Sequence, residues 1–125
     1  MPLLPKGVSK AWENRKGPVI FITVDKNEVP NAIYVTCVTK FDEETIVIAD
    51  NYFDKTRSNI LTGSKGAILF ITNEDKAFQV KGTIEYQTEG DVFEDMKKWN
   101  PKQHPGHAVA ILKVEKVYSG AEKLL

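Results

Sequence analysis

The sequence IVIADNYFDKTRSNIL occupies residues 46–61 and predicts a strand, a turn and a helix in direct succession. Its first part belongs to an apolar, β-branched run over residues 45–49, which is typical of a buried strand. Polar residues at 50–52 indicate a turn. The following residues predict a short helix over 55–62, and Gly63 is placed to end it in a left-handed conformation. A helix start therefore lies directly after a strand end.

Five more segments share the signature of a β-strand. They are rich in β-branched and aromatic residues, and most are bounded by Gly, Pro, Asn or Asp. The segments cover residues 19–24, 32–39, 67–72, 77–88 and 108–118. In residues 77–88 apolar and polar residues alternate, which indicates one buried and one solvated face, and Gly82 predicts a bulge. The sequence therefore predicts six strands.

Three short helices complete the predicted set of elements. Besides the helix over 55–62, residues 3–14 and 91–99 carry apolar side chains at helical spacing. Turn signals are frequent and no β-α-β unit repeats, so we expect a mainly β fold in which six antiparallel strands close into a barrel. Residues 119–125 are expected to be loose.

Size and charge set limits on the kind of protein. A chain of 125 residues and 14.1 kDa predicts a single domain over residues 1–125. With 17 basic and 17 acidic residues the formal net charge is zero, which argues against nucleic acid as a partner. Residues 1–16 lack a secretory signal, no window approaches the roughly 18 apolar residues of a membrane span, and Cys37 is the single cysteine. We therefore expect a cytoplasmic protein without a membrane partner.

Lys55, Thr56 and Arg57 form the first candidate site. Two cationic side chains, a hydroxyl and the unpaired N–H groups of a helix start could hold a phosphate group. Cations at this end of a helix oppose its dipole, and a bound anion would relieve that repulsion. In the alternative interpretation, Asp54 caps a surface helix and the two cations are solvated. The local pattern leaves both interpretations open.

The turn that precedes this helix is the second candidate. Asp50, Asn51 and Tyr52 could present backbone groups and an aromatic ring to a flat heterocycle. Asp and Asn are also common residues of ordinary turns, and for the turn taken alone this simpler interpretation is the stronger one.

The remaining candidates do not indicate a metal site or a nucleophile. His104 and His107 are close in sequence, but a zinc site needs at least a third protein ligand, so we expect loop histidines near a pocket or an interface. Cys37 lies in a predicted strand without a nearby base and is expected to be a small core residue. No nucleophile elbow, P-loop or dinucleotide-binding glycine run occurs. We assign no catalytic residue and no metal.

Eight segments follow one another in an order that carries further information. They are VIFITV, PNAIYVTCV, TIVIADN, FDKTRSNIL, AILFIT, AFQVKGTIEYQT, DVFEDMKKW and AVAILKVEKV. With this order, residues 10–119 resemble the small FMN-binding split-barrel proteins related to pyridoxamine 5′-phosphate oxidase, and the pair Lys55 and Thr56 is the most specific element. The resemblance implies a six-stranded antiparallel split barrel that forms a homodimer and holds FMN at each of two interface sites.

The same resemblance implies roles for three groups of residues. The FMN phosphate would be bound at the helix start, by Lys55 and Thr56 with Arg57 and Asn59 as further donors. The ribityl chain and the flavin ring would run beside the strand residues Ala32, Ile33 and Tyr34. The opposing turn near the ring would be Asp50, Asn51 and Tyr52, largely through backbone groups.

These implications lead to one functional hypothesis and two alternatives. We expect a flavoprotein that transfers electrons or hydride through FMN, with a nicotinamide, a small oxidisable molecule or another redox protein as its partner. The first alternative is an enzyme resembling pyridoxamine 5′-phosphate oxidase or a flavin reductase, which a pocket over the flavin lined by His104, His107 or Trp99 of the second chain would favour. The second is a non-catalytic module that binds another cofactor, such as a deazaflavin or haem, or a regulatory ligand.

Overall fold

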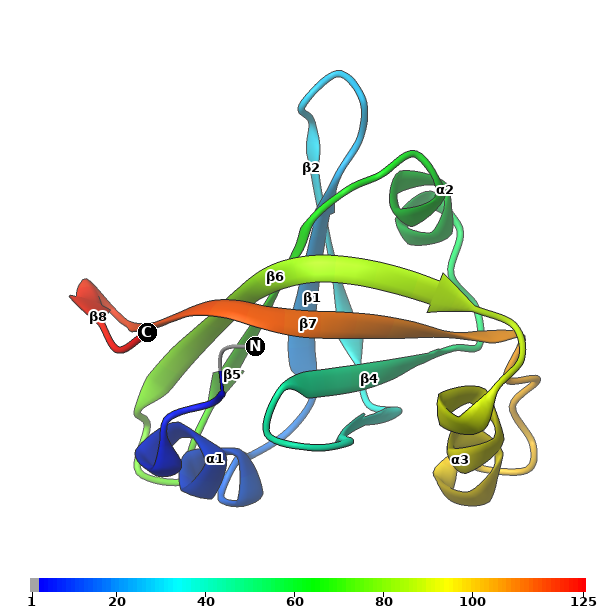
Figure 1. The fold of residues 1–125 in the computed structure, drawn as a ribbon. Helices are drawn as coiled ribbons and strands as arrows, with labels where there is room; N and C mark the ends of the chain where they lie inside the picture. Colours follow the sequence, from blue (N-terminus) through cyan, green and yellow to red (C-terminus); the bar gives the residue numbers. More distant parts are fainter. Residues whose placement is uncertain (1–2) are drawn as a thin grey trace.

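The computed structural model describes residues 3–125, which form a curled antiparallel sheet with three short helices around it (Figure 1). The helices are α1 (Lys6–Glu13), α2 (Lys55–Leu61) and α3 (Asp91–Trp99). The strands are β1 (Val19–Val24), β2 (Pro30–Val35), β3 (Val38–Lys40), β4 (Thr45–Asp50), β5 (Gly66–Ile71), β6 (Ala77–Gln87), β7 (Ala108–Ser119) and β8 (Glu122–Lys123). The prediction of a mainly β fold is confirmed. Residues 1 and 2 of the expected domain lie outside the described residues.

The strand count differs from the prediction, because residues 3–125 contain eight strands and not six. The predicted strand over 32–39 is interrupted at Thr36 and Cys37, which separate β2 from β3. Seven strands follow the order β2-β1-β5-β6-β7-β4-β3, so β2 and β3 lie at opposite ends of it. The chain therefore passes from one edge of the sheet to the other within two residues, and the curled sheet has the split-barrel form.

The eighth strand comes from the C-terminal tail, and the expectation of a loose tail is wrong. Strand β8 pairs with the end of β7, where Tyr118 lies opposite Lys123. The amide groups of Leu124 and Leu125 donate to the carbonyl of Val117, and both leucine side chains pack against the core. Backbone pairing and apolar burial therefore hold the tail in place.

Strands β6 and β7 are the longest strands described, and they run side by side across the molecule (Figure 1). Their register shifts between Lys81 and Gly82, which confirms the predicted bulge. A Cβ atom at Gly82 would lie 1.8 Å from the carbonyl oxygen of Lys113. The close approach of the two backbones at the bulge therefore requires glycine.

Strand β4 is buried on both of its faces, which fixes the turn that follows it. Ile46 and Ile48 belong to the main core inside the sheet. Val47 and Ala49 face the other way and belong to a second cluster, which Met96 of α3 completes. A strand that packs on both faces is a rigid support, so residues 50–53 begin from a fixed position.

The helices begin and end close to the predicted residues. Helix α1 is shorter than the predicted 3–14, and it buries Val8 and Trp12 against the barrel. Helix α2 ends at Leu61, and Gly63 shortly after it has a φ of 95° and donates to the carbonyl of Ile60, which confirms the left-handed ending. Within residues 3–125, no helix has both the length and the apolar character that a membrane span requires.

Candidate functional site

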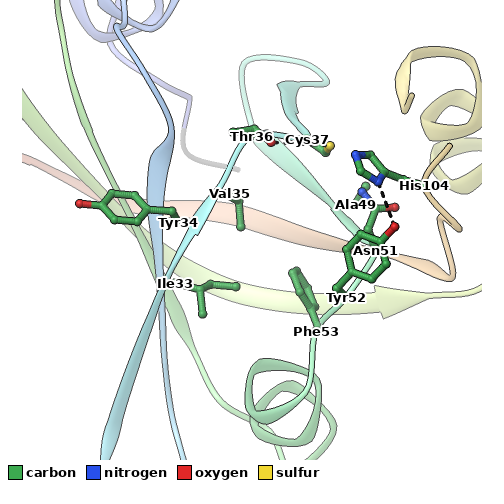
Figure 2. A pocket seen from close by; sticks show the side chains of 10 residues that line it. All are labelled: Ile33, Tyr34, Val35, Thr36, Cys37, Ala49, Asn51, Tyr52, Phe53 and His104. Atoms are coloured by element: carbon green, nitrogen blue, oxygen red, sulfur yellow. Dashed lines mark hydrogen bonds between the residues drawn. The ribbon is translucent and has the colours of Figure 1, made fainter. Parts of the chain in front are cut away.

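An open pocket of about 300 Å³ lies between β2 and the turn after β4 (Figure 2). The side of β2 and the following bend is formed by Ile33, Tyr34, Val35, Thr36 and Cys37, and the opposite side by Ala49, Asn51, Tyr52, Phe53 and His104. Ligand sites typically combine apolar walls with a few fixed polar groups in roughly 300–1,000 Å³, and this pocket has that composition at the lower end of the range.

The turn at Asn51 is locked to the loop that precedes β7. The amide groups of Asn51 and Asn100 donate to each other at 3.0 and 2.9 Å, and both side chains are buried. The amide oxygen of Asn51 also accepts from the backbone N–H of Gly106 at 2.9 Å. Lys97 donates to the carbonyls of Pro105 and Gly106. Three hydrogen bonds therefore commit the Asn51 side chain to this loop and hold the turn in place.

Tyr52 and His104 form a pair at the edge of the pocket (Figure 2). The Tyr52 hydroxyl lies 3.1 Å from His104 Nδ1, and the two rings meet edge to face with centroids 5.5 Å apart. The Tyr52 residue is 71% exposed, so its ring is not part of the core. This pair brings a hydroxyl and an imidazole to the edge of the pocket.

Asp50 does not line the pocket and is bound within the protein. Its buried carboxylate accepts from Arg57 Nε at 2.7 Å and Nη2 at 2.9 Å, from the Tyr86 hydroxyl at 2.5 Å and from the Phe53 amide at 3.1 Å. Burial favours the neutral acid, yet the hydrogen bonds from Arg57, Tyr86 and Phe53 hold the pKa of Asp50 below its usual value. Burial and the Asp50 charge raise the pKa of Tyr86. Asp50 is therefore an anionic anchor for α2 and β6.

Helix α2 begins beside β2 and is tied to the sheet by two buried side chains. The Thr56 hydroxyl accepts from Asn31 Nδ2 of β2 at 3.1 Å, which leaves its own proton uncommitted. Asn59 donates its amide to the Thr23 hydroxyl of β1 at 3.0 Å. Lys55 is exposed. Asp54 makes no side-chain cap hydrogen bond, so the alternative interpretation in which it caps the helix is not supported.

The structure brings some of the sequence-derived candidates together and separates others. Ile33, Tyr34, Asn51 and Tyr52 line the pocket. Ala32, Asp50, Lys55, Thr56, Arg57 and Asn59 do not line it, although Thr56 is linked to β2 through Asn31. The side chains of Arg57 and Asn59, which were expected to be phosphate donors, are bound to Asp50 and Thr23.

Sequence reasoning missed part of the pocket wall. Cys37 was expected in the core but is half-buried and lines the pocket. His104 lines the pocket, as expected of a loop histidine, whereas His107 is exposed and does not line it. Phe53 also contributes a wall, and its aromatic ring was a sequence signal for stacking on a ligand. For Cys37 the only available signal was position, because it lies three residues after Tyr34.

Comparison with known proteins identifies relatives over nearly the whole chain. Residues 8–120 match the family described as pyridoxamine 5′-phosphate oxidase. An uncharacterized protein of Methanocaldococcus jannaschii is 33% identical over 123 residues, which cover 93% of this chain and 80% of that protein.

Solved structures share the fold. HupZ of Group A Streptococcus superposes with a TM-score of 0.80 at 28% identity, over 94% of each chain. An FMN-binding protein from Syntrophomonas wolfei superposes with a TM-score of 0.74 at 24% identity, over 87% of this chain and 80% of that one. The second similarity concerns the fold alone.

Proposed function

Because the chain belongs to the pyridoxamine 5′-phosphate oxidase family, we propose that it is a flavoprotein that binds FMN non-covalently and transfers electrons or hydride through it. The pocket is the observation that carries this proposal. It places Ile33 and Tyr34 of β2 opposite Asn51 and Tyr52 of the turn after β4. These are two of the three segments that the family resemblance relates to the cofactor.

The walls of the pocket suit a flat heterocycle. Ile33 and Phe53 supply apolar surface, and Asn51 presents backbone groups while its side chain is held elsewhere. A ring system between such walls would lose contact with water and be oriented by a few polar groups. When bound, FMN supplies the electron chemistry, and the protein supplies position and electrostatic environment.

The start of α2 suits the phosphate end of FMN. Lys55 is exposed, and the Thr56 hydroxyl keeps a proton to donate because it accepts from Asn31. A phosphate carries roughly two negative charges at neutral pH and needs such direct donors when it leaves water. Arg57 uses Nε and Nη2 on Asp50 and keeps Nη1 as a further donor. We assign Asn59 to the support of α2 and not to the phosphate.

Titration of the purified, cofactor-free protein with FMN tests the proposal. We expect quenched flavin fluorescence, a stoichiometry of one FMN per chain and weaker binding of riboflavin, which lacks the phosphate. A deazaflavin and haem serve as competitors. Binding of either one without binding of FMN would contradict the proposal and favour a different cofactor.

The partner of the flavin can be identified with the same preparation. Anaerobic mixing of the FMN-loaded protein with NADH, NADPH and candidate oxidants would show which compound exchanges electrons with it. Turnover of a small substrate would indicate an enzyme, and exchange with another redox protein would indicate a carrier. The single cysteine, Cys37, supports a reducing compartment such as the cytoplasm.

A further inference from the structure

A hydrogen bond and edge-to-face ring packing fix Tyr52 and His104 at the edge of the pocket. A tyrosine that is 71% exposed can bond to water, yet Tyr52 bonds to His104 and packs against its ring. The loop that carries His104 is fastened at Asn100 and Gly106 to Asn51, the residue before Tyr52. Groups that are preorganised in this way on a pocket wall are typical of a functional site.

The other polar side chains of the pocket are less suited to contact a ligand. Both the oxygen and the nitrogen of the Asn51 amide are engaged within the protein, and this side chain is buried. The Tyr34 ring points away from Tyr52 (Figure 2). The Thr36 hydroxyl has only a 3.9 Å contact with the sulfur of Cys37. Among the residues that line the pocket, Tyr52 is therefore the exposed side-chain donor whose orientation a hydrogen bond fixes.

The direction of the hydrogen bond determines what the pair offers. When His104 Nδ1 carries a proton, it donates to the Tyr52 oxygen, and the Tyr52 proton is free to point into the pocket. A hydride carries two electrons and one proton, so a neutral flavin ring that accepts it gains one negative charge. A hydrogen bond to a charged acceptor is about twice as strong as one to a neutral acceptor.

We propose that Tyr52 donates a hydrogen bond to the bound flavin that stabilises its reduced, negatively charged form, and that His104 is the positioning residue that directs the Tyr52 proton. This inference rests on the proposed binding of FMN. It assigns to this pair the tuning of the flavin's reduction potential.

The test compares binding of oxidised FMN and of dithionite-reduced FMN to the same variants under anaerobic conditions. Tyr52→Phe removes the hydroxyl and keeps the ring, and His104→Phe removes the nitrogen and keeps an aromatic edge. We expect affinity for reduced FMN to fall roughly tenfold or more, the usual contribution of a hydrogen bond to a charged group. Affinity for oxidised FMN should change far less, so the reduction potential of the bound flavin should fall.

The double variant and two remote variants complete the test. If His104 acts through Tyr52, the double variant should lose no more than Tyr52→Phe alone. Tyr118→Phe, on β7 beside Lys81, and His107→Phe, which is outside the pocket, should leave the ratio of the two affinities unchanged. Equal losses for both oxidation states, or an unchanged ratio in Tyr52→Phe, would overturn the inference while FMN binding stands. Failure of the unaltered protein to bind FMN in either state would overturn the proposed function as well.

Discussion

At the scale of single residues, Asp50 links the candidate site to the core. Its carboxylate is fully buried at the end of β4 and accepts hydrogen bonds from Arg57 of α2 and Tyr86 of β6. Position in the sequence suggested that Asp50 and Arg57 would both meet a ligand. In the folded chain Asp50 and Arg57 bind each other, so their main contribution is to hold α2 against the sheet.

Asp50→Asn should destabilise the protein measurably. The substitution keeps the shape of the side chain but removes the charge that balances Arg57, which is 35% exposed. Removal of one partner from a buried pair costs about 3–5 kcal/mol, and partial hydration of Arg57 reduces this to roughly 2–3 kcal/mol. Urea unfolding at pH 7 measures the loss, and a change below about 0.5 kcal/mol, as for an ordinary surface substitution, would contradict the anchor role.

The same pair predicts how stability depends on pH. The pKa of Asp50 is lowered in the folded state, so its contribution is complete above about pH 5 and is lost as the pH falls through the unfolded-state value near 3.9 toward the lower folded-state pKa. The difference in unfolding free energy between the unaltered protein and Asp50→Asn should therefore shrink between about pH 5 and pH 2. A difference that stays constant over this range would show that Asp50 is not ionised in the folded protein.

Lys55 is expected to act on the phosphate and not on the flavin ring. Lys55→Ala should weaken FMN binding by roughly tenfold or more, because a hydrogen bond to a charged group is lost. Riboflavin has no phosphate, so its affinity should be unchanged. Lys123→Ala, in β8, is the matched control. Equal losses of affinity for FMN and riboflavin, measured by fluorescence titration, would show that Lys55 does not contact the phosphate.

At the scale of elements, the bulge in β6 fixes how β6 crosses β7. Gly82→Ala would place a methyl group 1.8 Å from the carbonyl of Lys113, so one strand must move. We expect a loss of about 3 kcal/mol, at the upper end of typical overpacking costs. Gly7→Ala in α1 is the control, since nothing lies within 4 Å of its added Cβ and a helical Gly→Ala change should stabilise by roughly 0.5–1 kcal/mol. If the bulge did not require glycine, thermal and urea unfolding would show similar changes in stability for Gly82→Ala and Gly7→Ala.

The elements show what sequence patterns can and cannot predict. Helix α3 has the predicted bounds, because its apolar stripe is local information. The break between β2 and β3 at Thr36 and Cys37 was missed, because residues 32–39 are rich in β-branched residues on both sides of it and the break depends on where β4 and β1 lie. Strand β8 was missed for the same reason, since Lys123 pairs only after β7 is in place.

At the scale of the whole molecule, the candidate site is assembled from distant segments. The pocket joins β2, the turn after β4 and the loop before β7, and the predicted site residues Ile33, Tyr34, Asn51 and Tyr52 do meet there. The pairing of Tyr52 with His104 across 52 residues could not be predicted, because no local pattern reports contacts over such a separation. The sequence pattern therefore indicated which segments form the candidate site. Tertiary contacts determined which of their side chains remain free to contact a ligand.

The exposed edge of the sheet at β2 is relevant to the oligomeric state of the protein. Strand β2 pairs only with β1 among the described residues, and it leaves Tyr34 74% exposed beside the pocket. Exposed edge strands are commonly covered in natural proteins. We propose that a second copy covers this edge, so light scattering at micromolar concentration should give twice the chain mass of 14.1 kDa. A monomer with full FMN affinity would contradict a shared site.

A crystal structure of the protein co-crystallised with FMN tests the central claim most directly. The flavin ring should lie in the pocket between Ile33 and the turn at Asn51 and Tyr52, with the phosphate at Lys55 and Thr56. Electron density for the ring at any other place on the barrel, or a pocket without flavin at saturating FMN, would contradict the assignment of this pocket as the cofactor site.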